Sequence, residues 1–359
     1  MKKIFHIVSN KEWGGGEQYV YDLCQRQIAD KIDVGIFCKP IPEIISKYEE
    51  AGIKVYPINL GGVLDFKSAF SLAQLIKKEQ IGIIHAHNFK DAFIACYARR
   101  LSGNKLLRVV MCRHLTRPGK NSFLYRWLYK QLDCLCFDSE LSKAAFLSTG
   151  PTIDPSKIRI VHTSIVVPAQ TIPAPIREEF SIPKDTVLAM FHGRLDPEKG
   201  IDILIEAAAL LKGTNFRLAL VGRGSEKYTA QIQQLITDKG LQNHVLLLGF
   251  RHPVLPYVAA ADFGVLASTV SEGCPLSPQE YMSQGHPVVA TNNGGQREYI
   301  IHEKNGFLVN PGDSQALASA MRLLIEQPEL RRELGLEAKA TYDKYLNYDH
   351  FYAQIKKIY

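Results

Sequence analysis

The chain has 359 residues, 46% of them apolar and 22% charged, and a formal net charge of +7. This length predicts two domains that each bury a core, and the composition excludes disordered, fibrous and low-complexity classes. The amino terminus lacks a signal-peptide core, and no apolar run reaches the ~18 residues of a membrane span, so we expect a cytoplasmic protein. The seven cysteines show no C-x-x-C spacing, which indicates reduced thiols without a disulfide framework or zinc site.

The positive charge is concentrated in the first half of the chain. Residues 1–165 carry a formal charge of +9, and the remainder carries −2. The densest stretch, 92–132, contains no acidic residue and nine basic ones: Arg99, Arg100, Lys105, Arg108, Arg113, Arg117, Lys120, Arg126 and Lys130. Such a basic patch attracts anions, which could be lipid headgroups, phosphorylated acceptors or nucleic acid.

Short apolar runs alternate with amphipathic segments along the chain. The strands predicted in the first half cover residues 3–8, 34–37, 54–58, 81–86, 107–111 and 134–138. Those in the second half cover residues 186–192, 216–222, 244–249, 262–268, 287–291 and 306–309. This alternation is typical of the α/β class and predicts two Rossmann-like domains with parallel sheets. We place the amino-terminal domain at 1–165, a proline-containing linker at 166–185 and the second domain at 186–342.

Residues that directly follow the predicted strands are the candidates for ligand contact, because open parallel sheets bind ligands beyond the carboxyl ends of their strands. Gly15 and Gly16 follow the first strand and open a helix near Glu17. Glycines allow a close backbone approach, and helix amino termini favour phosphate. An ordinary flexible turn explains this glycine cluster equally well.

Two cations follow the first strand of the second domain. Arg194 comes directly after Gly193, and Lys199 stands at the start of the next helix. Together they could grip a pyrophosphate and neutralise the charge that develops on a leaving nucleotide. The alternative is that both are ordinary solvated surface cations, which is the more common fate of an isolated Arg or Lys.

Two glutamates lie at and beyond the end of the strand at 262–268. Pro275 suits the first turn of a helix, which would put Glu272 in the preceding loop and Glu280 on the helix. We expect one carboxylate to hold sugar hydroxyls and the other a ribose, as positioning groups. Solvated side chains on a surface helix are the alternative.

His85 lies near the end of the strand at 81–86 and His87 directly follows it, and the two can share one face of the sheet. No third ligand with suitable spacing is near, so we expect no metal. We expect His87 to hydrogen-bond a sugar and His85 to be buried and structural. Four further glycines that follow strands are candidates for backbone contacts with the donor: Gly222, Gly224, Gly294 and Gly295.

Four motifs occur in an order that resembles glycosyltransferase family 4, over nearly the whole chain. They are HGRLDPEKG (192–200), LVGRGSE (220–226), SEGCPLSPQE (271–280) and NNGGQREYIIHEKNGFLVNPGD (292–313). The resemblance implies the GT-B architecture, in which two Rossmann-like domains face each other across a cleft. It also implies that the final helix, 343–359, packs on the first domain. The segment HTSIVVP (162–168) departs from the family pattern, which puts the hinge-side contacts in question.

The resemblance also implies roles for individual residues. Arg194 and Lys199 would contact the donor diphosphate, Glu272 the sugar hydroxyls and Glu280 the ribose. His87 would lie near the transferred sugar, and Gly15 and Gly16 near the phosphates or acceptor. The other implied donor-binding positions are Gly193, Gly222, Gly224, Gly273, Cys274, Pro275, Leu276, Gly294 and Gly295.

The implied activity is retaining sugar transfer from a UDP-sugar, or less favourably a GDP-sugar, without a cofactor or divalent metal. No covalent nucleophile is required: the acceptor attacks the face from which the nucleotide departs, and the departing phosphate can take its proton. The acceptor, a saccharide or lipid-linked glycan of polysaccharide or lipopolysaccharide biosynthesis, would bind the first domain.

The segment 121–132 suggests a peripheral contact with anionic membrane through residues 99–132, at the inner face of the cytoplasmic membrane. Its Phe123, Leu124, Trp127, Leu128 and Leu132 share one helical face, opposite Arg126 and Lys130. A core helix with two solvated cations is the competing interpretation.

Several rival functions remain. Nucleic acid is disfavoured because the patch has few interleaved aromatics. An oxidoreductase is disfavoured because G-x-G-x-x-G is missing after the first strand. A non-catalytic nucleotide-sugar-binding protein and a GT-B phosphorylase or epimerase stay open.

Overall fold

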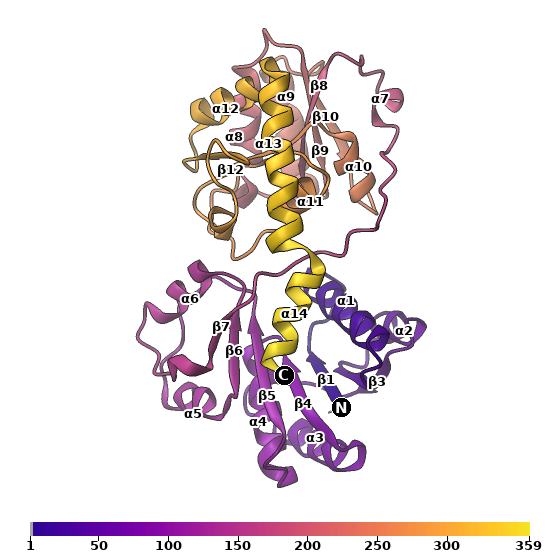
Figure 1. The fold of residues 1–359 in the computed structure, drawn as a ribbon, viewed down its shortest axis with the longest axis vertical. Coiled ribbons are helices and arrows are strands. Elements are labelled where there is room, and N and C mark those ends of the chain that lie inside the picture. The colour runs from indigo at the N-terminus through magenta and orange to yellow at the C-terminus, as the bar shows by residue number, and fades with distance from the viewer. Residues whose placement is uncertain (1–2) are drawn as a thin grey trace. The chain divides into compact units, whose positions relative to one another are not determined.

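The computed structural model describes residues 3–359, which divide into two compact units (Figure 1). The first unit runs to His162 and also contains Tyr352–Tyr359, and the second unit is Thr163–Phe351. Each unit is one parallel sheet covered by helices. The predicted class of two Rossmann-like α/β domains is therefore confirmed.

The sheet of the first unit has seven strands in the order β3-β2-β1-β4-β5-β6-β7. The strands are β1 (Lys3–Val8), β2 (Val34–Cys38), β3 (Lys54–Pro57), β4 (Ile81–Ala86), β5 (Arg108–Arg113), β6 (Cys134–Phe137) and β7 (Ile158–Ile160). The helices are α1 (Gly15–Ala29), α2 (Pro42–Glu50), α3 (Phe66–Glu79), α4 (Phe89–Ser102), α5 (Phe123–Gln131) and α6 (Glu140–Leu147). Only β7 escaped prediction, because three residues are too few to show a period.

The sheet of the second unit has six strands in the order β10-β9-β8-β11-β12-β13. The strands are β8 (Val187–His192), β9 (Phe216–Val221), β10 (Val245–Gly249), β11 (Phe263–Leu266), β12 (Val288–Thr291) and β13 (Gly306–Val309). The helices are α7 (Ile176–Glu179), α8 (Ile201–Ala209), α9 (Glu226–Asp238), α10 (Leu255–Ala260), α11 (Leu276–Ser283), α12 (Ser314–Glu326), α13 (Pro328–Thr341) and α14 (Tyr348–Ile358), which ends in the first unit. All six predicted strands of this half are present.

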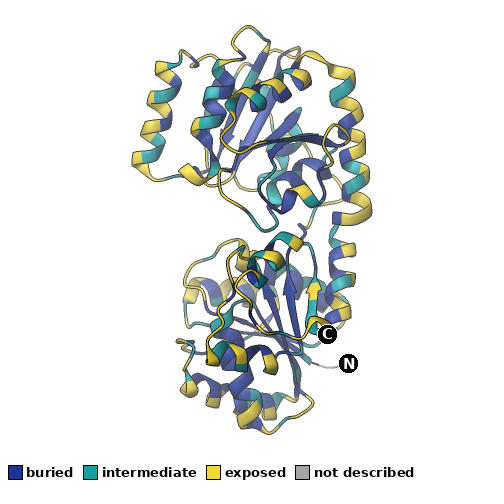
Figure 2. Ribbon diagram, turned by 90° about the vertical axis from the view of Figure 1, so that its left-hand side faces the viewer, coloured by how far each residue is buried: buried dark blue, intermediate teal, exposed yellow. Residues whose placement is uncertain are grey.

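Successive side chains of a strand point to opposite faces of its sheet, and both faces of these sheets are covered. In the first unit, Phe5 and Ile7 of β1 belong to an apolar core shared with α3 and α4. His6, between them, faces α1, where it contacts Gln27. Figure 2 shows the central strands of both units as largely buried. The near-continuous apolar runs of the sequence follow from this double coverage.

Each sheet has one point where the chain reverses the direction in which strands are added. In the first unit this switch point lies between β1 and β4, and in the second between β8 and β11. Because all strands are parallel, their carboxyl ends share one edge, and a crevice opens at the switch point. Each unit therefore carries one favoured position for a ligand.

The domain boundaries differ from the predicted ones in two places. Residues 166–185, expected to be a linker, belong to the second unit, where Ile176 and Ile182 are buried in its core. The final segment belongs to the first unit from Tyr352, not from residue 343. Residues 343–351 belong to the second unit instead. Tyr342 and Leu346 anchor this stretch there, because both are buried in the core of the second unit. Among the described residues, no helix has both the length and the apolar character needed to cross a membrane.

Candidate active site

The turns that follow β8 and β9 pack tightly against each other, next to the second unit's switch point. A Cβ built on Gly222 would lie 1.8 Å from the Gly193 carbonyl oxygen, and Gly222 has a φ of +155°. A Cβ on Gly224 would lie 2.3 Å from the carbonyl oxygen of Leu195. These glycines are required by the fold itself, so their presence alone does not indicate donor contact.

Lys199 and Glu272 meet across this switch point. The Lys199 Nζ lies 2.5 Å from the Glu272 Oε2, and the two side chains are 18% and 20% exposed. The other Glu272 carboxylate oxygen accepts a hydrogen bond from Ser268. The Glu272 carbonyl accepts from the Gly295 amide at 2.8 Å. The structure thus joins two predicted site residues into one ion pair.

Glu280 lies on α11, as predicted, and pairs with a histidine that the sequence analysis did not select. Its Oε2 contacts the Nε2 of His192, the last residue of β8. Tyr281 donates its single hydroxyl proton to the Met190 carbonyl at 2.8 Å, so its oxygen accepts from the His192 Nδ1 at 2.8 Å. His192 could have been selected from the HGR motif, because it is the last residue of a predicted strand and so lies where ligands bind.

Arg194 is 74% exposed and pairs with Asp196 at 3.0 Å. It lines a cavity of about 400 Å³ together with His192, Gly193, Val221, Gly222, Arg223, Phe250, Arg251, His252 and Val254. Phe250, Arg251 and His252 were not predicted, although they follow β10 and the post-strand rule would have selected them. The Arg223 guanidinium lies 5.4 Å from the centre of the Phe250 ring. The cavity wall is thus both aromatic and cationic.

The loop before α11 accounts for the remaining residues of the Glu272 motif. Pro275 is the N-cap, and the helix begins at Leu276, so the prediction that Pro275 lies in the first turn was wrong by one residue. The N-cap has the extended backbone that also suits proline. The sulfur of Cys274, which follows Gly273, accepts a hydrogen bond from the Gln279 side-chain nitrogen at 3.3 Å. The same nitrogen also donates to the Thr163 carbonyl at 2.8 Å. The atypical segment 162–168 thus still contacts this motif.

Two observations concern the glycines of the other loops. A Cβ on Gly294 would lie 2.1 Å from the Gln296 Oε1, so its small size has a packing cause. In the first unit, α1 begins at Gly15 instead of near Glu17. Glu17 accepts from the Gly14 amide at 3.0 Å, which caps the helix. Within the described residues, no atom lies within 4 Å of a Cβ built on Gly15, and the nearest to one on Gly16 is an Asn10 nitrogen at 3.8 Å.

Three histidines gather at the switch point of the first unit. His6 pairs with His85 in the register of β1 and β4, and His87 follows β4 directly. The rings of His85 and His87 lie 4.3 Å apart, which confirms that they share one face. One nitrogen from each of the three lies within 4.8 Å of the others. The expectation that no third ligand was near was wrong, because His6 is distant in sequence and adjacent only through the sheet.

Burial keeps these imidazoles neutral. It lowers the pKa of His6 to about 4 and the pKa values of His85 and His87 well below their ordinary value, with a smaller contribution from neighbouring histidines. Neutral imidazole offers one donor and one acceptor. The cluster can therefore hydrogen-bond hydroxyl groups without adding charge.

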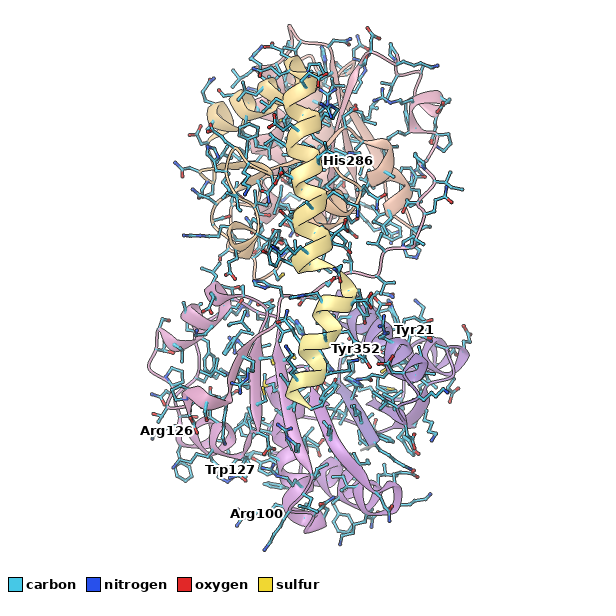
Figure 3. All side chains as sticks on the ribbon, viewed as in Figure 1. Tyr21, Arg100, Arg126, Trp127, His286 and Tyr352 are labelled. Atoms are coloured by element: carbon cyan, nitrogen blue, oxygen red, sulfur yellow. The ribbon has the colours of Figure 1, made fainter. Side chains whose placement is uncertain are left out.

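Part of the basic patch is used internally. Arg99 pairs with Asp133 at 2.7 Å, Arg108 donates to the Tyr359 carbonyl, and the buried Arg113 donates to the Leu115 carbonyl. Six of the nine cations remain exposed: Arg100, Lys105, Arg117, Lys120, Arg126 and Lys130. Figure 3 shows Arg100 and Arg126 extending outward from α4 and α5. The exposed patch is thus smaller than predicted.

The apolar face of α5 packs mainly into the first unit. Leu128 and Leu132 are buried, and the Trp127 ring stacks on that of Tyr97 at 5.0 Å. Phe123 is the exception, at 80% exposure. The structure thus favours the core-helix interpretation for most of the predicted membrane face.

Two protein families match the chain. The "Glycosyltransferase Family 4" model matches residues 13–167, and the "Glycosyl transferases group 1" model matches residues 174–341. EpsD of Bacillus subtilis (strain 168), whose name places it among glycosyltransferases, is 32% identical over 286 residues, covering 75% of this chain and 74% of EpsD.

Two further comparisons span almost the whole chain. The UDP-Gal:alpha-D-GlcNAc-diphosphoundecaprenol alpha-1,3-galactosyltransferase of Escherichia coli is 25% identical over 92% of this chain and 88% of its own. The structure of Anabaena Alr3699/HepE in complex with UDP superposes with a TM-score of 0.84 at 22% identity, over 99% of this chain and 98% of that one. At this level of sequence identity, the similarity to HepE shows a shared fold.

Proposed function

The chain belongs to glycosyltransferase family 4 and is a glycosyltransferase, and we propose that it transfers a sugar with retention from a UDP-sugar to a saccharide or lipid-linked acceptor. One observation carries this proposal: charged side chains converge at the second unit's switch point, beside an aromatic and cationic cavity. A nucleoside diphosphate carries both the negative charge and the flat base that such a site binds.

We assign the donor to the second unit. Arg194 is free enough to reach a diphosphate, because it is exposed and its ion pair with Asp196 is a surface one. Lys199 stands ready to neutralise the leaving group, and Glu272 to hold sugar hydroxyls. Glu280, oriented by His192, would hold the ribose. The remaining donor contacts are proposed for backbone groups of Gly193, Gly222, Gly224, Gly273, Cys274, Pro275, Leu276, Gly294 and Gly295.

We assign His87 to the transferred sugar, and Gly15 and Gly16 to the phosphates or the acceptor. The space beside Gly15 supports the latter assignment, because packing within the unit does not require a glycine there. The amides of the first helical turn have no intrahelical acceptors, so they can meet an anion.

The proposed reaction uses no metal and no covalent enzyme intermediate. As the bond from the sugar to the diphosphate breaks, Lys199 and Arg194 would stabilise the negative charge on the departing oxygen. The acceptor hydroxyl would attack the same face, and its proton would pass to the departing phosphate. Lys199 can shift toward the phosphate while Ser268 continues to hold Glu272.

Uridine is preferred over guanosine as the base, and the acceptor is proposed to belong to polysaccharide or lipopolysaccharide biosynthesis. HepE is known in complex with UDP, and the Escherichia coli relative acts on a diphosphoundecaprenol-linked sugar. A lipid-linked acceptor would place the enzyme at the inner face of the cytoplasmic membrane.

Exposed apolar side chains beside the cations support a peripheral membrane contact. Leu101, Leu106 and Phe123 are 50%, 83% and 80% exposed, and Arg100 and Lys105 flank the first two in sequence. Apolar anchors next to cations suit an anionic lipid surface. Co-sedimentation with anionic vesicles at low salt, reduced by Leu106→Ser, is expected. Equal binding to zwitterionic vesicles, or none to either, would remove this contact from the proposal.

Donor turnover tests the proposed function directly. Purified protein is incubated with UDP- and GDP-sugars in EDTA, with and without candidate acceptors, and nucleotide diphosphate release is measured. Release with a UDP-sugar that survives chelation and is lost in Glu272→Gln is expected, and NMR of the product should show a retained anomeric configuration. Glu326→Gln, which alters only an exposed pair with Arg322, is the matched control. Inversion, or loss of activity on chelation, would contradict the proposal.

A further inference from the structure

A continuous hydrogen-bond chain lies behind His87. The His87 Nε2 lies 3.1 Å from the His6 Nδ1, and the His6 Nε2 lies 2.9 Å from the Gln27 Oε1. The Gln27 Nε2 donates to the Tyr359 hydroxyl at 3.1 Å, and that hydroxyl lies 2.9 Å from the His85 Nδ1. This hydrogen-bond chain thus joins β1, α1, β4 and Tyr359. These segments are too far apart in the sequence to form a local motif.

The direction of these hydrogen bonds follows from the chemistry of Gln27. Its Oε1 can only accept, so His6 carries its proton on Nε2. Neutral His6 then has a bare Nδ1, which must accept from the His87 Nε2–H. His87, also neutral, is left with a lone pair on Nδ1. That nitrogen is buried and has no partner among the described residues.

We propose that Gln27 and Tyr359 are positioning residues that hold His87 in the tautomer with its proton on Nε2, which makes its Nδ1 a hydrogen-bond acceptor. Tyr359 acts through Gln27: by accepting from the amide nitrogen it keeps the amide oxygen turned toward His6. The ligand group that suits the His87 Nδ1 is a hydroxyl donor, such as a hydroxyl of the transferred sugar or of the acceptor. This inference rests on the proposed function for the position of that hydroxyl, but not for the tautomer.

Packing supports the same assignment. His6, Gln27 and His85 are fully buried, so water does not compete for their hydrogen bonds. The His87 ring also lies against those of Tyr19 and His114, with centroid distances of 5.6 and 6.2 Å. A buried acceptor without a partner is costly in the free protein, and a ligand hydroxyl would remove that cost.

A metal ion on the three histidines is the main competing explanation. Both ring nitrogens of His6 already have hydrogen-bond partners, and its Nδ1 lies within hydrogen-bond distance of His87. A metal on the Nδ1 of His6 would break the contact with His87. The hydrogen-bonded arrangement needs no further component.

Nitrogen-15 NMR of the imidazoles tests the tautomer without requiring activity. In the intact protein, with the His87 signals assigned from His87→Gln, we expect a protonated Nε2 and a bare Nδ1. Tyr359→Phe removes only the hydroxyl, so Gln27 can rotate, and His87 should become a mixture of tautomers. Tyr352→Phe, on α14 and outside the hydrogen-bond chain, should leave the His87 spectrum unchanged.

Kinetics then separate positioning from structure. Tyr359→Phe should lower kcat about tenfold, the effect of one neutral hydrogen bond, with KM for the donor within about twofold. If Tyr359→Phe folds poorly, Gln27→Met should show the same change of tautomer and the same loss of kcat.

Three results would each overturn the proposal: a protonated His87 Nδ1 in the intact protein, an unchanged tautomer in both variants, or a shifted tautomer with unchanged kcat. So would stoichiometric zinc that survives dialysis and whose removal by EDTA shifts the three histidine spectra. If no sugar transfer is found but the tautomer is as stated, the proposed function fails and the tautomer assignment stands.

Discussion

The two switch points of this enzyme have the same topology but different chemistry. In the second unit, charged side chains pair across the switch point, with Lys199 on Glu272. In the first unit, buried neutral histidines hydrogen-bond in a chain, with His6 between Gln27 and His87. Lys199 and Glu272 follow β8 and β11, and His87 follows β4, so both sets include residues at the carboxyl edge of a parallel sheet. The shared topology therefore gives each unit the same favoured position for a ligand, and the local side chains determine whether that position suits phosphate or hydroxyl groups.

The sharpest way to break this comparison is to remove charge from the second switch point. Lys199→Met should lower kcat by about 10³-fold, because the leaving group loses its cation. It should also destabilise the second unit by about 3 kcal/mol, because Glu272 is left largely buried without its partner. Steady-state kinetics and urea unfolding measure the two effects.

A double variant separates these two effects. Lys199→Met combined with Glu272→Gln should regain most of the lost stability but none of the activity. Lys239→Met, which breaks an exposed pair with Glu206, is the matched control and should change stability by less than about 1 kcal/mol. Recovery of activity in the double variant would refute a direct role for Lys199.

The first switch point should instead be sensitive to acid. Burial lowers the pKa of His6 to about 4 and the pKa values of His85, His87 and His114 below 6.5, so the unfolded chain takes up protons first and stability is lost as pH falls below 6.5. Burial raises the pKa of Asp91 to about 7, which acts in the opposite direction. Four histidines outweigh one carboxyl, so we expect a loss on the order of 3 kcal/mol between pH 6.5 and 5.

Hydrogen exchange resolved by segment is the suitable measurement, since each unit must be followed separately. As the pH is lowered, the protection of backbone amides against exchange should fall in β1 and β4 and much less in β8 and β9. Asp91→Asn removes the opposing carboxyl and should steepen the loss in the first unit. Equal acid sensitivity in both units would contradict the neutral character assigned to the histidine cluster.

Arg194 tests whether the charged site extends into the cavity. Arg194→Ala should lower kcat/KM for the donor about 100-fold, through a lost charge-assisted bond to phosphate. The free energy of unfolding of the Arg194→Ala variant should change by less than about 0.5 kcal/mol, because the Arg194 side chain is largely exposed. Arg332→Ala, another exposed arginine paired with a nearby carboxylate, should leave both quantities unchanged. A loss confined to stability would remove Arg194 from the donor site.

Patterns local in sequence predicted most of the fold and identified several residues that the structure brings together at the candidate site. Twelve strands followed from apolar runs, and Lys199, Glu272 and Glu280 from their places beside those strands. His6 was missed because its partners come from β4 and α1, so only the sheet register brings them together. The two interpretations of α5 could not be separated from the sequence, because helical spacing identifies an apolar face but not what covers it. The partner of that face, Tyr97, lies on another helix.

The smallest predicted effect concerns Gly15, where fold and function should oppose each other. A Cβ at Gly15 meets no atom of residues 3–359 within 4 Å, and Gly15 is the first residue of α1. Gly15→Ala should therefore stabilise the first unit by about 0.5 kcal/mol. If a ligand approaches this backbone, the same methyl group should lower kcat/KM about tenfold, which corresponds to about 1.4 kcal/mol. Gly213→Ala, in the second unit and equally unobstructed, should leave kcat/KM unchanged. A stabilised Gly15→Ala variant with full activity would mean that the glycine turn of the first switch point does not contact the ligand, which would leave the histidines as its only proposed contact there.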